Sequence, residues 1–172
     1  MAWGGGASLP EGMTLRRARI GDARHIGDLA RELAGPMTDE QARRRFLRFV
    51  LGPSYLVFVV EDSADDGRLV GLWFGREGHF LGADLPYVQT LGLAVVPDQR
   101  RRGIASHLMV VCPPDSHHSQ NWFTTQHPHL HDLYEGLGFA VSGTRFVRYP
   151  EHRAPLPRHR RALRSLTRRL GR

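Results

Sequence analysis

The 172-residue sequence has no lysine, a single cysteine and no long apolar run. One cysteine, Cys112, excludes an internal disulfide framework. The longest apolar candidate for a membrane span, Tyr55 to Val60, has the length of a strand, far below the ~18–20 residues that a span needs. The first residues also lack the basic and then apolar layout of a secretory signal. We therefore expect a cytoplasmic protein without a membrane span.

The composition suits one folded domain. Hydrophobic residues make up 41% of the chain, which is enough for a packed core and unlike a disordered chain. A chain of 172 residues is long enough for one domain and short for two. We expect a flexible Gly-rich leader over residues 1–13, a folded domain over 14–149 and an Arg-rich tail over 150–172.

The net charge of +7 belongs to the tail. Residues 151–172 contain eight arginines and one acid, whereas the first 150 residues contain 16 arginines and 16 acids. A neutral domain body argues against nucleic acid as a partner, although the overall charge would favour it. The tail places Leu163, Leu166 and Leu170 on one helical face. A solvated tail and a basic amphipathic helix for an acidic partner are both compatible with this pattern.

Apolar periodicity and turn residues predict alternating strands and helices. The expected strands are Thr14–Ile20, Tyr55–Glu61, Leu69–Phe74, Tyr87–Val96 and Asn121–Thr125, with one or two more over Phe139–Tyr149. Two expected helices begin after N-caps at Asp22 and at Thr38. Two further helices are expected over Ile104–Val111 and from Pro128 or His129 to Leu137. This order predicts a three-layer α/β fold.

The segment after the fourth strand predicts an anion site. The strand ends at Pro97, and a helix begins near Gly103 to Ala105. Amide groups at a helix start lack intrahelical acceptors and carry the positive end of the helix dipole, so a pyrophosphate fits there. Gly103 allows a close approach to the backbone, and the small Ala105 does not block it. For the arginines alone, an ordinary solvated turn is the competing interpretation.

Two segments resemble the GCN5-related N-acetyltransferase (GNAT) superfamily. Arg100, Gly103 and Ala105 match its Arg/Gln-x-x-Gly-x-Gly/Ala segment, and the preceding Leu93–Pro97 looks like its fourth strand. Farther on, His131–Phe139 is similar to its Leu-Tyr-x-x-x-Gly-Phe segment. The matches stand in the family's order. The resemblance implies a GNAT-like three-layer fold whose mixed central sheet is splayed between the fourth and fifth strands and flanked by helices.

The resemblance also implies a function. It indicates an N-acyltransferase that moves an acetyl group from acetyl-CoA to a primary amine by direct attack in a ternary complex, with no metal. The acceptor would be a small-molecule or peptide amine, and a homodimer is compatible with the sequence. The alternative is a catalytically weak acyl-CoA-binding domain that acts as a sensor or scaffold. Pro113 and Pro114 support that alternative because they cut the helix after the turn short.

The family's site residues carry over by position. Tyr134 would donate a proton to the leaving thiolate, and His127 stands where many relatives carry asparagine. The pantetheine arm would pair with the backbone of Leu93, Ala94 and Val95. The pyrophosphate would sit on the turn formed by Arg100, Arg101, Arg102, Gly103, Ile104 and Ala105.

The general base is less clear, because the strand from Tyr87 to Leu93 carries no carboxylate. Gln89 and Thr90 could at most orient a water molecule. Asp84 and His79, in the preceding loop, are further candidates for the base. A water relay, or an acceptor amine that is already partly neutral, is equally acceptable.

Other chemistry is less well supported. The histidines at positions 117, 118, 127, 129 and 131 are dense, but their spacing sends side chains to different faces and does not predict a converging zinc site. Cys112 is more typical of a buried thiol than of a nucleophile. The sequence leaves the acceptor unidentified, and we expect its pocket between the first two helices and the Gly75–Pro86 loop.

Overall fold

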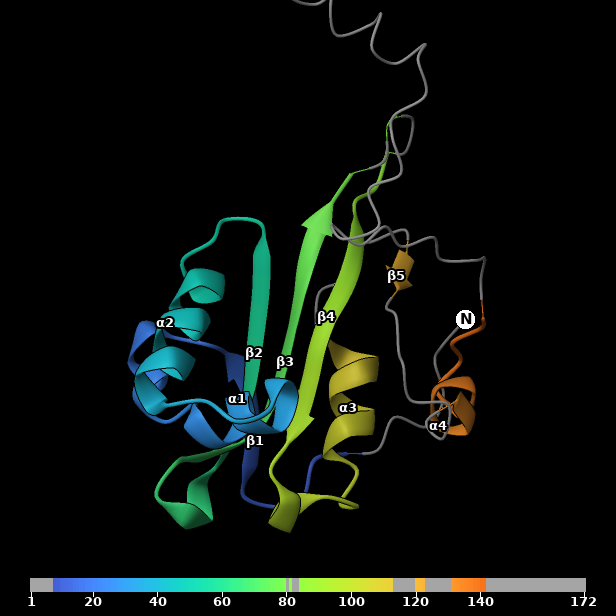
Figure 1. The fold of residues 1–172 in the computed structure, drawn as a ribbon. Coiled ribbons are helices and arrows are strands. Elements are labelled where there is room, and N and C mark those ends of the chain that lie inside the picture. Colours follow the sequence, from blue (N-terminus) through green and yellow to red (C-terminus); the bar gives the residue numbers. More distant parts are fainter. Residues whose placement is uncertain (1–7, 80, 82–83, 113–119, 123–130, 142–172) are drawn as a thin grey trace, which may run out of the picture. The chain divides into compact units, whose positions relative to one another are not determined.

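The computed structural model describes residues 8–79, 81, 84–112, 120–122 and 131–141 (Figure 1). Residues 1–139 form one compact unit and residues 140–172 a second. His127, residues 1–7 of the expected leader and the whole expected tail lie outside the described residues. The described helices and strands all belong to the first unit.

A five-stranded sheet forms the middle layer, in the order β1-β2-β3-β4-β5. Neighbouring strands are antiparallel from β1 to β4, and β5 is parallel to β4. The strands are β1 (Met13–Arg17), β2 (Tyr55–Asp62), β3 (Arg68–Gly78), β4 (Tyr87–Val95) and β5 (Gln120–Trp122). The α/β class and the mixed sheet expected from the sequence are confirmed.

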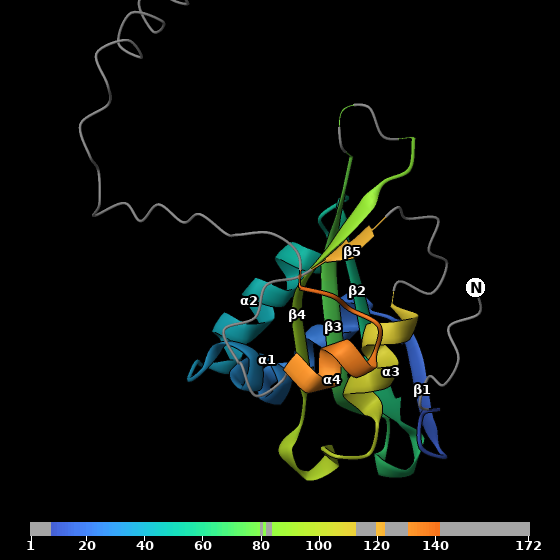
Figure 2. The same cartoon turned by 90° about the vertical axis from the view of Figure 1, so that its right-hand side faces the viewer.

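Helices cover both faces of this sheet. α1 and α2 lie on one face, and α3 lies on the other (Figures 1 and 2). The helices are α1 (Gly27–Ala34), α2 (Asp39–Val50), α3 (Ile104–Val111) and α4 (His131–Gly136), with short 3-10 turns η1 (Ile20–Arg24), η2 (Ser63–Asp65) and η3 (Pro97–Gln99). None of these described helices combines the length and the apolar character that crossing a bilayer requires.

The start of α2 follows from a local sequence pattern. The Gln41 amide donates to Thr38 Oγ1 at 3.2 Å, and the Thr38 amide donates to Gln41 Oε1 at 3.0 Å. This reciprocal capping box satisfies two amide groups that the helix itself leaves without acceptors. The expected N-cap at Thr38 is confirmed, and the helix buries Ala42 and Phe46 against the sheet.

The N-cap expected at Asp22 is wrong, because α1 begins at Gly27. Asp22 is buried in η1, where its carboxylate accepts from the Arg16 guanidinium at 2.8 and 2.9 Å and from the Arg19 amide at 2.7 Å. Burial alone would raise the pKa of Asp22, but the Arg16 and Arg19 donors hold that pKa below its usual value. The first strand accordingly ends at Arg17 instead of Ile20.

The third strand was expected to end at Phe74, but β3 continues to Gly78. Two of the added residues are glycines. A Cβ on Gly75 would lie 2.6 Å from Trp73 Cη2 and 3.0 Å from the Gln89 carbonyl oxygen. A Cβ on Gly78 would lie 2.6 Å from the Tyr87 ring. Aromatic rings thus cover the backbone where side chains are missing. These glycines were predicted to lie in a loop, but they are strand residues against which neighbouring aromatic rings pack closely.

The C-terminal elements are shifted relative to their expected limits. β5 begins at Gln120, and α4 begins at His131 within the described residues. Phe139–Val141 form no strand, so the expected start of the last strand is wrong. The other parts of these expected elements, residues 123–125, 128–130 and 142–149, lie outside the described residues.

Gly71 sets the distance between α3 and the sheet. A Cβ at Gly71 would lie 3.0 Å from Ile104 Cγ2 and 3.2 Å from Leu108 Cδ1. Both α3 side chains are fully buried in this contact. The first turn of α3 is therefore held directly against β3, which fixes where the preceding turn lies.

Substitution of Gly75 by alanine should lower the free energy of unfolding by about 1–3 kcal/mol, because the fully buried Trp73 ring cannot easily move away from the added methyl group. The matched control is Gly21→Ala, where a Cβ meets nothing within 4 Å and a change within about 0.5 kcal/mol is expected. Urea unfolding measures both. Equal stability of the two variants would contradict the close packing over Gly75.

Candidate functional site

The turn between β4 and α3 and the first residues of α3 contain a row of amide groups without acceptors in the described chain. Gly103 is the N-cap of α3, with φ at 82°, and the first hydrogen bond of the helix runs from the His107 amide to the Gly103 carbonyl at 2.9 Å. The amide groups of residues 101–106 meet no acceptor within the described part of the chain. Donors at a helix start that lack acceptors favour an anion.

The backbone of this turn is held in a rarely used conformation. Arg101 has a φ of 62°, in the left-handed region that non-glycine residues seldom adopt. Such a residue costs on the order of 1–3 kcal/mol and persists only where its surroundings hold it. Consecutive amides in conformations of this kind form anion-binding concavities. The strain at Arg101 therefore coincides with the amide groups that lack acceptors.

Two ion pairs anchor the turn from opposite sides. Asp98 accepts from the Arg68 guanidinium of β3 at 2.9 and 3.2 Å, and this contact holds the pKa of Asp98 below its usual value. Arg100 forms an ion pair with Glu32 of α1, and its Nε donates to the Val95 carbonyl at 3.2 Å. The turn is thus joined to β3, to β4 and to the helix on the other face of the sheet.

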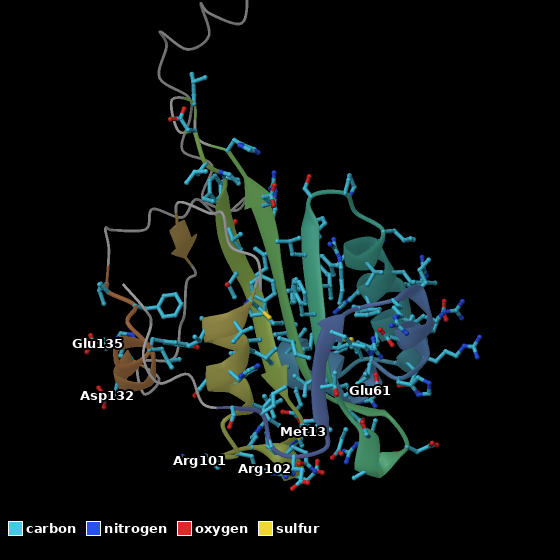
Figure 3. The ribbon with its side chains drawn as sticks, turned by 180° about the vertical axis from the view of Figure 1, so that it is seen from behind. Met13, Glu61, Arg101, Arg102, Asp132 and Glu135 are labelled. Carbon is cyan, nitrogen blue, oxygen red and sulfur yellow. The ribbon has the colours of Figure 1, made fainter. Side chains whose placement is uncertain are left out.

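The three arginines of the turn have different surroundings. The Arg100 guanidinium is engaged as described, and its amide donates to the Pro97 carbonyl at 3.3 Å. Arg102 donates to the Gln99 side chain. Arg101 is exposed and contacts no acid among the described residues. Figure 3 shows Arg101 and Arg102 at the end of the molecule where the turn lies.

Within the described residues, one edge of β4 is paired with another strand only at its beginning. β5 pairs with Tyr87, Val88 and Gln89 at the beginning of β4. Within the described chain, no strand pairs with that edge of β4 along Leu93–Val95. The Val95 carbonyl accepts from Arg100. The three residues expected to contact pantetheine therefore lie on an edge that a further extended group could join.

A β-bulge interrupts the middle of β4. Phe74 pairs with Gly92 and Gly75 pairs with Thr90, so Leu91 has no partner residue on β3 and is 40% exposed. The sequence analysis did not predict this bulge. The residue that could have indicated it is Gly92, where a Cβ would lie 2.2 Å from Phe74 Cε1. Bulges bend a strand and redirect side chains, and they are frequent beside active sites.

Tyr134 lies on α4, which is next to α3 in both views (Figure 2). Its side chain is half-buried, packs against the core and meets the Phe139 ring edge-on with centroids 6.4 Å apart. Burial raises the pKa of Tyr134, so the phenol stays protonated at neutral pH. The acidic α4 residues Asp132 and Glu135 point away from the sheet (Figure 3).

The two loop residues that are candidates for the general base lie far from the Pro97–Gly103 turn. His79 and Asp84 are both exposed. Their loop follows β3 and precedes β4, at the end of these strands opposite to the Pro97–Gly103 turn (Figure 1). Gln89 and Thr90 are on β4 itself, before the bulge. The assignment of a base among these residues stays a prediction.

An apolar cavity of about 220 Å³ lies between the sheet and the α1–α2 layer. Strands β2 and β3 contribute the lining residues that do not come from the helical layer, and no described residue of the Gly75–Pro86 loop lines it. The acceptor pocket expected between the first two helices and that loop stays a prediction. Arg45 is its one charged lining residue. The lining residues are Ile26, Ala30, Leu33, Ala34, Met37, Ala42, Arg45, Phe46, Phe49, Val57, Leu72 and Phe74.

The family follows from a sequence comparison. A family model described as an acetyltransferase (GNAT) domain matches residues 53–141, which is half of the chain. The protein belongs to the GNAT acetyltransferases. The expected family membership is thereby confirmed. No curated protein matches the chain at a significant level.

Solved structures of GNAT proteins share the fold. A GNAT family acetyltransferase from Staphylococcus aureus has 12% identity and a TM-score of 0.67, with 80% of this chain and 98% of that chain covered. The aminoglycoside N-acetyltransferase AAC(6')-Iy in complex with CoA has 20% identity and a TM-score of 0.64, with coverage of 80% and 95%. Glucosamine-6-phosphate N-acetyltransferase from Arabidopsis thaliana has 19% identity and a TM-score of 0.61, with coverage of 80% and 98%.

Neither metal ligands nor a reactive thiol accompany this GNAT site in the described residues. No group of three or more His, Cys, Asp or Glu side chains is placed there to hold a metal ion. Most of the dense histidines lie outside the described residues, and His131 is exposed. Cys112 is 2% exposed at the end of α3, and burial raises its pKa to about 12. A thiol with this pKa is not a nucleophile at neutral pH.

The native GNAT domain should therefore react slowly with a thiol reagent. At pH 8, modification of Cys112 by a chromogenic disulfide should be at least about 100-fold slower in buffer than in 6 M urea, because the thiol must first be exposed and ionised. Absorbance at the reagent's thiolate band measures the rate. Fast modification of the folded protein would show that Cys112 is accessible and that its burial is wrong.

Proposed function

We propose that this GNAT protein is an N-acetyltransferase that transfers the acetyl group of acetyl-CoA to a primary amine by direct attack in a ternary complex. The observation that carries the proposal is the row of amide groups over residues 101–106, which lack acceptors in the described part of the chain. They lie in a turn that two ion pairs hold in place.

The donors present suit acetyl-CoA. A pyrophosphate carries two negative charges, and backbone amides at a helix start can donate hydrogen bonds to its oxygens without rearrangement. Arg101 and Arg102 would add charge around it, whereas Arg100 would act by holding the turn to Glu32. The amide groups of pantetheine would pair with the edge of β4 along Leu93–Val95, which no strand of the described chain joins.

The reaction needs two proton transfers around one attack. The amine nitrogen forms a bond to the thioester carbonyl carbon, and the carbon–sulfur bond breaks. Tyr134 would donate its phenolic proton to the leaving thiolate, and its raised pKa means that the phenol carries this proton at neutral pH. The nitrogen loses its proton to a water molecule or a base. Gln89 and Thr90 could orient such a water, and Asp84 and His79 remain candidates for the base.

Replacing Tyr134 by phenylalanine tests the role of the phenol. The variant keeps the ring contact with Phe139 and loses the proton donor, so kcat should fall about 10²-fold or more with little change in the KM for acetyl-CoA. The measurement is CoA release, followed with a thiol reagent, over a panel of chemically diverse amines. Phe139→Leu is the control, because it changes the packing and keeps the hydroxyl.

Each outcome of this experiment has a clear meaning. Acetyl-CoA binding without thiol release for any amine would favour a sensor or scaffold and contradict the proposed activity. Equal kcat for the parent and Tyr134→Phe would show that another group protonates the thiolate.

Arg101→Gln should weaken acetyl-CoA binding about two- to fivefold at low salt, because an exposed charge pair contributes up to about 1 kcal/mol. At 0.5 M salt the difference should nearly vanish, since screening removes the attraction. Calorimetric titration at the two salt concentrations measures it. Arg24→Gln, on η1, removes the same charge elsewhere and should bind like the parent. A salt-independent loss would mean that Arg101 acts through the turn and not through its charge.

A further inference from the structure

The cavity under α1 and α2 has the size of one apolar side chain. Its volume is about 220 Å³, and all its lining residues except Arg45 are apolar. An engineered protein cavity of roughly 150 Å³ with a similar lining stays dry and binds benzene. The cavity can therefore accept a phenyl or branched alkyl group, but it is too small for a whole drug-sized ligand, which fills about 300–1,000 Å³.

The wall of the cavity reaches the bulge on β4. Phe74 and Leu33 line the cavity, and both lie within 3.0 Å of the position that a Cβ on Gly92 would take. Gly92 directly follows Leu91, the bulge residue. The cavity lies on the α1–α2 face of the sheet, and α3 with its amide groups lies on the other face (Figure 1). A molecule anchored in the cavity thus approaches the middle of β4 from the face opposite to α3 and the amide groups at its start.

The positive charge of Arg45 at the cavity disfavours binding of a polycation. Its lining contains no carboxylate. The side chain of the exposed Arg45 donates to Met37 Sδ at 3.9 Å and forms no ion pair within the described chain. A thioether is a weak acceptor, so this guanidinium has no anionic partner there. The lining residues would offer no counter-charge to an aminoglycoside, which carries several ammonium groups, and a sugar phosphate would leave the apolar walls unfilled.

We propose, building on the proposed acetyltransferase function, that the acceptor is an α-amino acid with an aromatic or branched apolar side chain. The side chain fills the cavity, and the carboxylate pairs with Arg45. Burial of such a side chain corresponds to about 10- to 150-fold in affinity. A pair with an exposed guanidinium corresponds to about two- to fivefold. The apolar contact therefore determines the substrate class, and Arg45 adjusts it.

The preference among amines gives the first test. For the parent, kcat/KM for acetylation of L-phenylalanine and L-leucine should exceed that of L-alanine at least tenfold, and kanamycin should be a poorer substrate still. Phenylalanine should exceed phenethylamine, which lacks the carboxylate, two- to fivefold. Preference for L-alanine or for kanamycin would overturn the proposal and leave the acetyltransferase function standing.

Substitutions in the cavity give the second test. Ala30→Leu fills the cavity from α1 and should remove the preference for phenylalanine over alanine, while the exposed Ala64→Leu should retain it. Arg45→Gln should abolish the preference for phenylalanine over phenethylamine. Arg44→Gln removes the same charge from the neighbouring exposed position of α2, which does not line the cavity, and should keep the preference. Equal behaviour within either pair would overturn the assignment.

A binding measurement separates this proposal from the acetyltransferase function. The probe is 3-phenylpropionate, which has the ring and the carboxylate but no amine to acetylate. It should raise the melting temperature of the full chain in the absence of acetyl-CoA, and Ala30→Leu should remove that rise. If the probe does not bind and Ala30→Leu only stabilises the protein, the cavity is a packing void and the proposal is wrong. Probe binding without acetylation of any amine would overturn the acceptor role together with the proposed function.

Discussion

The amide groups at the start of α3 are the constraint around which the rest of the site is arranged. A row of donors without acceptors is costly unless solvent or an anion reaches it, and Arg101 adds a strained backbone to that cost. Contacts with the rest of the fold hold the turn in this conformation despite both costs. Gly71 lets α3 pack directly on β3, and ion pairs join Asp98 to Arg68 and Arg100 to Glu32. The positions of the donors are thus set before any ligand binds.

The features that the sequence predicted correctly are those that depend on neighbouring residues. The capping box of Thr38 and Gln41 involves two residues three positions apart, and its partners are visible in the sequence itself. The same holds for the strand that ends before Pro97 and for the helix limits Ile104–Val111, which the structure reproduces. Short-range hydrogen bonding and restricted φ angles determine such features, so a pattern of residue types is sufficient to find them.

The features that the sequence reading missed depend on partners far along the chain. Glu32 and Arg100 are 68 positions apart, and no pattern around Arg100 shows that its charge is engaged. Gly75 resembles a loop residue until the Trp73 and Gln89 atoms beside it are known. The bulge at Leu91 and the cavity under α1 and α2 likewise arise only when strands and helices are packed together. Residue types alone do not specify those distances.

The position of β4 between two different surroundings explains why donor and acceptor recognition can be separate. Its C-terminal end leads into the amide groups at the start of α3, whose sequence resembles the Arg/Gln-x-x-Gly-x-Gly/Ala segment of the GNAT family. The opposite face, at Gly92, meets Phe74 and Leu33 from a cavity whose lining belongs mostly to α1 and α2. Under the proposed function, substitutions in those two helices would alter the acceptor without moving the Pro97–Gly103 turn, because the sheet lies between them. The ion pair of Arg100 with Glu32 is a direct link across this separation, so α1 has to keep its position while its apolar face varies.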